Sequence, residues 1–197
     1  MNPILGNTAA DAAFGRLYSD VLVSEDASGR LVPDLAAEVP TIGNGGISAD
    51  GLTIRYKLRT NVKWQDGQPF TSADVKFTFD AVMNPANDVS GRVGFDDVSR
   101  VDVPDARTIV FHLRHRYAPF VTTVFGDGCG VLPAHILARE KTINDVSFNA
   151  APVGTGPFRV VRWERGNRIE LRRNDQTRPR RKYGDFAVAR ARDRLGV

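Results

Sequence analysis

Gly51–Val82 reads GLTIRYKLRTNVKWQDGQPFTSADVKFTFDAV, and this stretch decides the fold. Its first part, Leu52–Arg59, alternates apolar and polar residues, which predicts a strand with one buried face. Asp66-Gly67 predicts a turn, because glycine tolerates a positive φ and an aspartate side chain can hydrogen-bond nearby backbone. Thr71 is suited to cap a helix, and the apolar residues after it recur at helical spacing, which predicts a buried helix face. Those apolar residues are Val75, Phe79 and Val82 or Met83.

Composition indicates an ordinary globular chain. Its 197 residues are 42% hydrophobic and 25% charged, enough for one domain with a sizeable core. No apolar run is long enough to cross a membrane, and Met1–Gly6 lacks the basic and apolar segments of a secretory signal. The net charge is +4, but residues 176–197 hold six Arg and one Lys against two Asp, a net +5 that leaves −1 for the rest. The excess basicity therefore lies in the C-terminal tail.

The remaining patterns predict short strands and helices, an α+β architecture. A helix running into a strand is expected over Ala9–Val23. Hairpins are expected where 98–103 pairs with 108–113, and where 158–163 pairs with 168–172 across the turn at 164–167. The other expected elements are one helical turn after Pro33 within Leu31–Val39, a loop over Thr41–Gly51, and short helices over Pro119–Phe125 and Pro133–Glu140.

Several short blocks carry a resemblance to a known family. They are Pro33-Asp34-Leu35-Ala36, Asp50-Gly51-Leu52-Thr53, Val62-Lys63-Trp64-Gln65-Asp66-Gly67, Phe70-Thr71-Ser72-Ala73-Asp74-Val75, Ala151-Pro152-Val153-Gly154-Thr155-Gly156-Pro157-Phe158, Trp163, Arg168-Ile169 and Arg172-Arg173-Asn174-Asp175. In order and spacing they resemble the N-terminal lobe of the bacterial extracytoplasmic solute-binding proteins of the oligopeptide, dipeptide and nickel type (family 5), which feed ABC importers. No single block is decisive, but their order is specific.

The resemblance implies lobe I of a two-lobed periplasmic-binding-protein-like fold. Residues 1–20 and 151–175 would form the base of that lobe, incomplete in this chain, and residues 21–150 an accessory subdomain. The likeness begins at about Asn2 and stops in the middle of a block after Asp175. We therefore expect a truncated fragment without the second lobe, whose residues 176–197 are a disordered or non-native basic tail. The alternative is a genuine, solvated basic tail.

The resemblance also implies a function. The parent protein would capture a peptide or related small solute between two lobes and present it to ABC transporter permease subunits, in the periplasm or cell envelope, without catalysis, cofactor or metal. Without a signal peptide, the chain as given would stay in the cytoplasm if expressed. The first-lobe side of the cleft would come from three loops, whose residues are Asn7 and Thr8, Gly94 and Phe95, and Phe125, Gly128 and Cys129. Because half of the cleft is missing, we expect weak or no solute binding by this chain alone.

Two other function classes compete. An interaction domain could use the run Arg178, Arg180, Arg181 and Lys182 to contact nucleic acid or an anionic membrane, but no fold-presented basic surface accompanies it, so we expect no nucleic-acid partner. A hydrolase could use Cys129 or an aspartate pair, but no triad emerges. The aspartates considered are Asp11, Asp66, Asp74, Asp96 and Asp97, of which Asp66 and Asp74 have turn and cap roles.

Two motifs have a structural interpretation. His112 and His115 are spaced as H-x-x-H, but residues three apart on a strand point to opposite faces and could not share a metal ion. Gly154-Thr155-Gly156-Pro157 lacks the Lys and Ser/Thr of a phosphate-binding loop, so we expect a tight turn of the chain. Cys129 is the single cysteine, which excludes an internal disulfide and predicts a small buried thiol.

Overall fold

A computed structural model describes residues 1–6, 8–126, 129–164 and 167–175. The helices are α1 (Ala9–Tyr18), α2 (Ser72–Met83), α3 (Phe120–Thr123) and α4 (Ala134–Leu137), with a 3₁₀ turn η1 at Ser147–Asn149. The strands are β1 (Val23–Glu25), β2 (Leu31–Pro33), β3 (Thr53–Lys57), β4 (Val98–Asp105), β5 (Thr108–Leu113), β6 (Phe158–Glu164) and β7 (Arg168–Arg173). The expected α+β architecture is confirmed.

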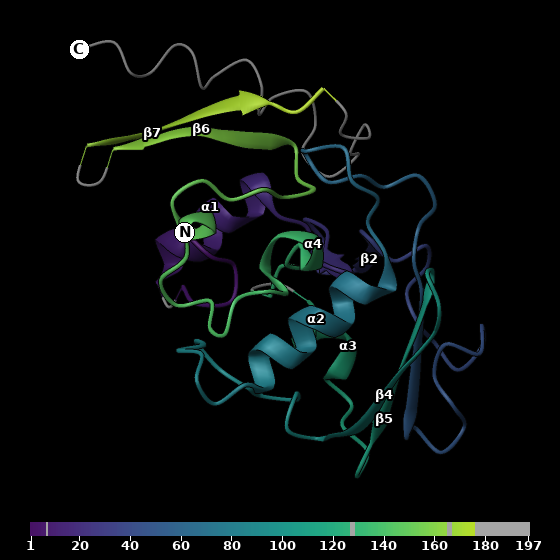
Figure 1. Cartoon of the computed structure of the whole chain (residues 1–197). Helices are drawn as coiled ribbons and strands as arrows, with labels where there is room; N and C mark the ends of the chain where they lie inside the picture. The colour runs from purple at the N-terminus through teal and green to yellow at the C-terminus, as the bar shows by residue number, and fades with distance from the viewer. Residues whose placement is uncertain (7, 127–128, 165–166, 176–197) are drawn as a thin grey trace.

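The central sheet is antiparallel with the order β3-β5-β4, and α2 covers one of its faces (Figure 1). The alternating residues of β3 place Ile54 and Tyr56 on the buried face, opposite Phe111 and Ile109 of β5. The ring centroids of Tyr56 and Phe111 are 6.0 Å apart, and Phe79 of α2 lies at the same distance from Phe111. The predicted strand and helix therefore form two sides of one aromatic core.

The segment between β3 and α2 is held by a buried carboxylate. Asp74, only 4% exposed, accepts hydrogen bonds from the Thr71 N–H at 2.8 Å, the Ala134 N–H at 2.9 Å and the Trp64 Nε1–H at 3.4 Å. These three donors connect the starts of α2 and α4 with the fully buried Trp64. Gly67 has a φ of 92°, which confirms the turn predicted at Asp66-Gly67.

Strands β6 and β7 form a separate antiparallel ribbon above α1 (Figure 1). Their apolar side chains share one face of the ribbon, since Val160 lies opposite Leu171 and Trp163 opposite Ile169. The hairpin prediction is confirmed for the strands, whereas residues 165 and 166 of the expected turn lie outside the described part of the chain.

A close contact between two backbones joins this ribbon to α1. A Cβ atom at Gly154 would lie 1.7 Å from the Tyr18 carbonyl oxygen, and the Gly156 N–H donates to that same oxygen at 2.9 Å. The Gln65 side chain holds the loop from the other side: its Nε2 donates to the carbonyl oxygens of Phe158 at 2.8 Å and Gly156 at 3.2 Å. The Gly154–Phe158 segment is thus a tight structural turn, as predicted.

The helical turn predicted after Pro33 is wrong. Leu31–Pro33 is strand β2, paired with β1, and the chain beyond it makes no helical hydrogen bonds. Instead, the Asp34 N–H donates to Leu22 O at 3.0 Å and the Ala37 N–H to Lys57 O at 2.7 Å. Neighbouring extended segments supply the backbone partners that a helix would otherwise provide. Among the residues the structure describes, no helix is both long and apolar enough to cross a membrane.

Candidate functional site

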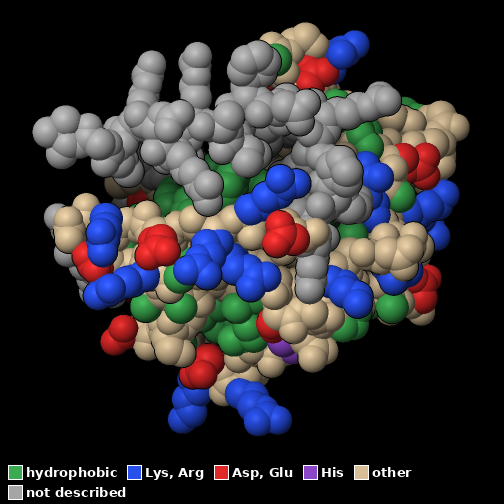
Figure 2. Space-filling model, turned by 90° about the horizontal axis from the view of Figure 1, so that it is seen from above, with side chains coloured by type: hydrophobic (Ala, Val, Ile, Leu, Met, Phe, Trp, Pro, Cys, Tyr) green, Lys and Arg blue, Asp and Glu red, His purple; other side chains and the backbone are tan. Residues whose placement is uncertain are grey.

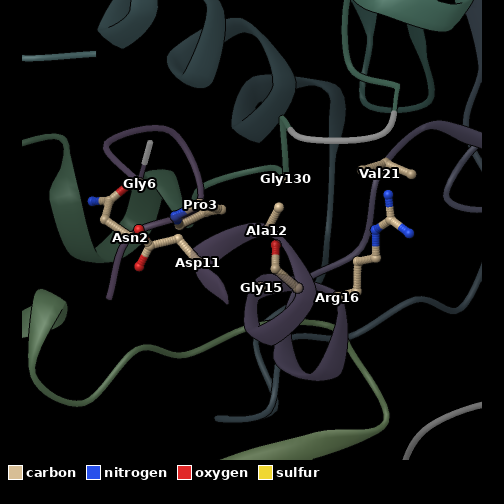
Figure 3. Close-up of a pocket in the computed structure, with 10 residues that line it drawn as sticks. Asn2, Pro3, Gly6, Asp11, Ala12, Gly15, Arg16, Val21 and Gly130 are labelled. Atoms are coloured by element: carbon tan, nitrogen blue, oxygen red, sulfur yellow. The ribbon is translucent and has the colours of Figure 1, made fainter. Parts of the chain in front are cut away.

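A small pocket lies between the N-terminal turn, α1 and the segment at Gly130 (Figure 3). Its volume is about 50 Å³. Figure 3 shows Asp11 beside Asn2 and Pro3 at one end and Arg16 beside Val21 at the other, with Ala12 and Gly15 between them. We call this space, lined also by Gly6, Ser19 and Gly130, the α1 groove.

Local sequence fixes the start of α1 beside the groove. Thr8 and Asp11 form a capping box: the Thr8 Oγ1 accepts from the Asp11 N–H at 3.1 Å, and the Asp11 Oδ2 accepts from the Thr8 N–H at 3.2 Å and from its hydroxyl at 2.7 Å. The helix ends at Tyr18, and the Ser19 N–H closes the last turn on Gly15 O at 2.8 Å. The groove therefore runs along a helix fixed at both ends.

Small residues create the space. A Cβ atom at Gly130 would come within 2.3 Å of Ser19 Oγ and 2.9 Å of Pro3 Cβ, so the groove is closely bounded on that side. At Gly15 the opposite holds, because nothing lies within 4 Å of a Cβ placed there. A side chain at Gly15 would have room that a side chain at Gly130 lacks.

The Ser19 hydroxyl is the unusual polar group of the groove. Ser19 is 7% exposed, and its Oγ has no hydrogen-bond partner in the described part of the protein. Buried hydroxyls are normally hydrogen-bonded, since leaving one unpaired costs free energy. The Oγ packs directly against Gly130, since a Cβ atom there would lie only 2.3 Å from it. The oxygen itself is buried, so the hydroxyl is part of the groove's wall and is not open to a ligand.

The structure places some of the residues predicted to line the cleft, and their environments differ. Asn7 and Gly128 lie outside the described residues, so the structure does not place them. Thr8 is exposed at the start of α1, two residues after the groove residue Gly6, and its hydroxyl donates to the groove residue Asp11. Gly94 is buried with a φ of +80°, and a Cβ there would lie 2.8 Å from Tyr117 and 2.9 Å from Val124.

Phe95 and Phe125 are core residues and do not present their side chains to a ligand. They are 4% and 0% exposed, and their ring centroids are 5.4 Å apart. The Phe125 carbonyl oxygen accepts from the Leu22 N–H at 2.9 Å, so its backbone is also engaged. Both residues are phenylalanines, and large aromatic side chains of this kind are also the ones that pack in the aromatic core. Their role is to hold the loops that carry Gly94 and Cys129.

Cys129 is partly exposed as a residue, but its thiol is enclosed. Burial raises the pKa of the thiol to about 12, well above the ordinary value of 9.0. The thiolate is the reactive form of cysteine, so this environment suppresses nucleophilic chemistry at neutral pH.

The histidines pair singly with carboxylates. The His112 Nε2 lies 2.8 Å from Asp102, and the His115 Nε2 lies 2.8 Å from Asp97, so the two residues of the H-x-x-H spacing use different partners. His135 lies 2.7 Å from Asp66 at the turn before α2. Within the described ranges, no three His, Cys, Asp or Glu side chains come together as metal ligands.

Sequence reasoning missed Gly15, Ser19 and Gly130. A weak signal was present, because Ala12 and Gly15 are small residues three apart on one side of α1, and Ser19 follows directly after the helix. The partner wall, from Pro3 and Gly130, is distant along the chain and has no signal in the sequence.

Solved structures define the class: the chain has the fold of part of one lobe of a periplasmic-binding protein. AppA of Bacillus subtilis, solved in complex with a nonapeptide, matches 89% of this chain with a TM-score of 0.80 at 23% identity. NikZ of Campylobacter jejuni, solved in complex with Ni(L-His), matches 82% of this chain with a TM-score of 0.73 at 34% identity. The chain covers 34% of the AppA chain and 31% of the NikZ chain.

Sequence comparison identifies the family. Residues 30–187 match the bacterial extracellular solute-binding proteins, family 5, in their middle region, and the chain belongs to this family. Protein XP55 of Streptomyces lividans is 32% identical over 155 residues, which are 79% of this chain and 27% of that protein. A Brucella ovis protein named "Putative ABC transporter peptide-binding protein" is 30% identical over 176 residues, which are 88% of this chain and 32% of that protein. The chain spans about a third or less of the length of these relatives.

Proposed function

We propose that this chain forms the first-lobe side of a solute-binding site in an ABC import system, with a peptide or related small solute as ligand. The observation that carries the proposal is the α1 groove. It is lined by Gly6 and Gly130, the chain neighbours of Asn7 and Cys129, which belong to two of the three loops that family resemblance assigns to the cleft. The printed name of the Brucella ovis relative and the nonapeptide bound to AppA support a peptide-like solute.

The proposed solute surface combines the groove with the exposed start of α1 at Thr8 and the loops at Gly94 and Cys129. Phe95 and Phe125 support it from beneath through their ring contact. Asn7, next to Thr8, and Gly128, next to Cys129, lie outside the described residues and stay part of the proposal. Binding rather than catalysis is the proposed activity, and the suppressed thiolate of Cys129 is consistent with it.

Solute capture in two-lobed receptors depends on closure of both lobes around the ligand. The chain covers only 27–34% of the length of these relatives, so this side alone would supply a fraction of the contacts. We therefore propose weak binding by this chain, delivery to permease subunits by the whole protein, and an extracytoplasmic location for that protein.

We do not propose an interaction domain that binds nucleic acid or a membrane through the basic run of the C-terminal tail. Arg178, Arg180, Arg181 and Lys182 lie outside the described residues. On the face seen in Figure 2, Lys and Arg side chains are interspersed with Asp and Glu. Binding to nucleic acid favours a fold that presents an unbroken basic surface, and this face does not present one.

The test is a ¹⁵N–¹H NMR titration of the chain with pooled dipeptides to pentapeptides. We expect shifts at the amides of Thr8, Gly94 and Cys129, and an affinity weaker than micromolar. The amides of Arg55 and His112, on the outer face of the central sheet, serve as an internal control and should stay in place. Micromolar affinity would contradict the weak-binding proposal. Saturating peptide with no shift at the three loop amides would contradict the site.

A further inference from the structure

We propose that the outer face of the β6–β7 ribbon binds an acidic segment of a partner protein through the side chains of Arg159 and Arg172. We call these two residues the arginine pair. The surface is separate from the α1 groove, because no residue of the ribbon lines that groove. The inference therefore goes beyond the proposed function, and its failure would leave solute binding untouched.

The register of the ribbon places the two arginines side by side. Arg159 of β6 lies directly opposite Arg172 of β7. Side chains that are directly opposite in antiparallel strands share a face, with Cβ atoms roughly 4.5–5.5 Å apart. The next pair along, Val160 and Leu171, is half-buried and belongs to the other face, since side chains alternate along a strand. The arginine pair is open to solvent, because both residues are exposed and the Arg172 side chain is 71% exposed.

The arginine pair has little negative charge to balance it. The Arg172 Nε lies 4.0 Å from Glu170 Oε1, at the limit of an ion pair. In the part of the chain that the structure describes, no carboxylate forms an ion pair with Arg159. Like charges directly opposite each other destabilise two paired strands. A carboxylate between the two guanidinium groups would offset this repulsion and could accept charge-assisted hydrogen bonds from both.

The other arginines of this face already have a carboxylate partner. The Arg162 Nε lies 3.0 Å from Glu164 Oε1, and the Arg168 Nε lies 3.4 Å from Glu164 Oε2. Both residues lie nearer the turn of the hairpin than the arginine pair does. The unbalanced positive charge is therefore concentrated at the base of the ribbon. That base is fixed in place, because the Asn174 N–H donates to Pro157 O at 2.8 Å.

The charge pattern favours a protein partner over a polyanion. Glu170 and Glu164 lie on the same face as the arginine pair, further toward the turn. Nucleic acid and anionic membranes carry negative charge throughout, so either would meet both glutamates as well as the arginines. A protein segment can instead place carboxylates at the arginine pair and neutral or basic groups beyond it, which is the usual form of complementarity at protein interfaces.

The first test is a ¹⁵N–¹H NMR titration with N-acetyl-tetraglutamate amide, an acidic probe, in 0.15 M salt. The Nε–H signals of Arg159 and Arg172 should shift, and Arg159→Gln should weaken probe binding about fivefold, the upper range for one exposed charge pair. Arg162→Gln is the matched control. It removes the same charge from the same strand and face, but from a guanidinium that Glu164 already holds. It should change probe affinity less than about twofold, because salt screens charges beyond about 8 Å.

The second test reverses one charge and separates loss of binding from loss of fold. In Arg159→Glu a carboxylate faces Arg172, so the cross-strand repulsion becomes an attraction. The thermal midpoint should rise while probe binding disappears. Arg168→Glu is the opposite case, because it places a second carboxylate directly across from Glu164. Its thermal midpoint should fall, and probe binding at the arginine pair should change less than about twofold.

Four outcomes would overturn the inference. One is an equal loss of probe affinity in Arg159→Gln and Arg162→Gln, which would show attraction to net charge alone. Another is a probe that shifts neither Nε–H signal of the arginine pair at millimolar concentration. The third is tighter binding of a DNA oligonucleotide or of phosphatidylserine vesicles than of the acidic probe, which would assign the surface to a polyanion. The fourth is a lower thermal midpoint in Arg159→Glu, which would show that the two arginines do not repel each other.

Discussion

Replacing Gln65 by alanine should loosen the connection between the central sheet and the β6–β7 ribbon. The Gln65 side chain donates through Nε2 to Phe158 O at 2.8 Å and Gly156 O at 3.2 Å, and its Oε1 accepts from the Gly154 N–H at 3.3 Å. The same loop presses against the Tyr18 carbonyl at the end of α1. One side chain thus supports both the ribbon and the helix that bounds the groove.

The size of the effect follows from these contacts. Each hydrogen bond contributes about 1 kcal/mol net, so three would give about 3 kcal/mol. Gln65 is only half-buried, and Gly156 O keeps a second donor, Asn174 Nδ2, at 3.0 Å. Water and Asn174 therefore replace part of the loss, and we expect a decrease of about 2 kcal/mol in the free energy of unfolding. For a chain of this size that is a fall of about 4–8 °C in thermal midpoint.

Urea unfolding at 25 °C measures the change, and two variants calibrate it. Gln68→Ala alters an exposed neighbour and should stay within about 0.5 kcal/mol of the parent. Gln65→Glu keeps the acceptor for the Gly154 N–H but turns a carboxylate oxygen toward the carbonyl oxygens of Gly156 and Phe158, so this variant should be less stable than Gln65→Ala at pH 7. Its free energy of unfolding should recover below about pH 4, where Glu is protonated. A cost below about 0.5 kcal/mol for Gln65→Ala, or a stable Gln65→Glu at pH 7, would refute the reasoning.

Three further predictions concern buried groups. Burial raises the pKa of Asp74 in the folded state, so the stabilising contribution of its carboxyl group is present below the unfolded pKa and is lost as pH rises through the folded pKa. In urea unfolding, the stability advantage of the parent over Asp74→Asn should therefore shrink from pH 4 to pH 7. An advantage that becomes larger over this range would contradict the raised pKa. In Gly154→Ala the new Cβ atom would lie 1.7 Å from the Tyr18 carbonyl oxygen, so we expect the free energy of unfolding in the same assay to fall by about 3 kcal/mol or more. Gly15→Ala is the control, because nothing lies within 4 Å of a Cβ at Gly15, and it should change stability only a little. Because burial raises the Cys129 thiol pKa to about 12, iodoacetamide at pH 8 should alkylate it far more slowly in the folded chain than in urea, and equal rates would show an accessible thiol.

The sequence predicted the elements whose side chains carry a period of their own. Thr53–Lys57 alternates and Ser72–Met83 keeps helical spacing, so both are readable without knowledge of their partners. The prediction of a helical turn within Leu31–Val39 was wrong for the opposite reason. Its conformation is set by hydrogen bonds to residues elsewhere, such as Asp34 to Leu22 and Ala37 to Lys57, and local pattern holds no trace of those partners.

The same distinction explains the site. Resemblance pointed to loops that flank the groove, yet two of the predicted residues, Phe95 and Phe125, are buried in the aromatic core. A loop position adjacent to a cleft can face either way, and only packing decides which. The groove itself depends on what is missing: no side chain at Gly15 and no room for one at Gly130, more than a hundred residues further along the chain. Space between distant segments has no residue of its own to carry a signal. The Ser19 hydroxyl becomes conspicuous only after folding, when its neighbours are known and its partner is absent from the described protein.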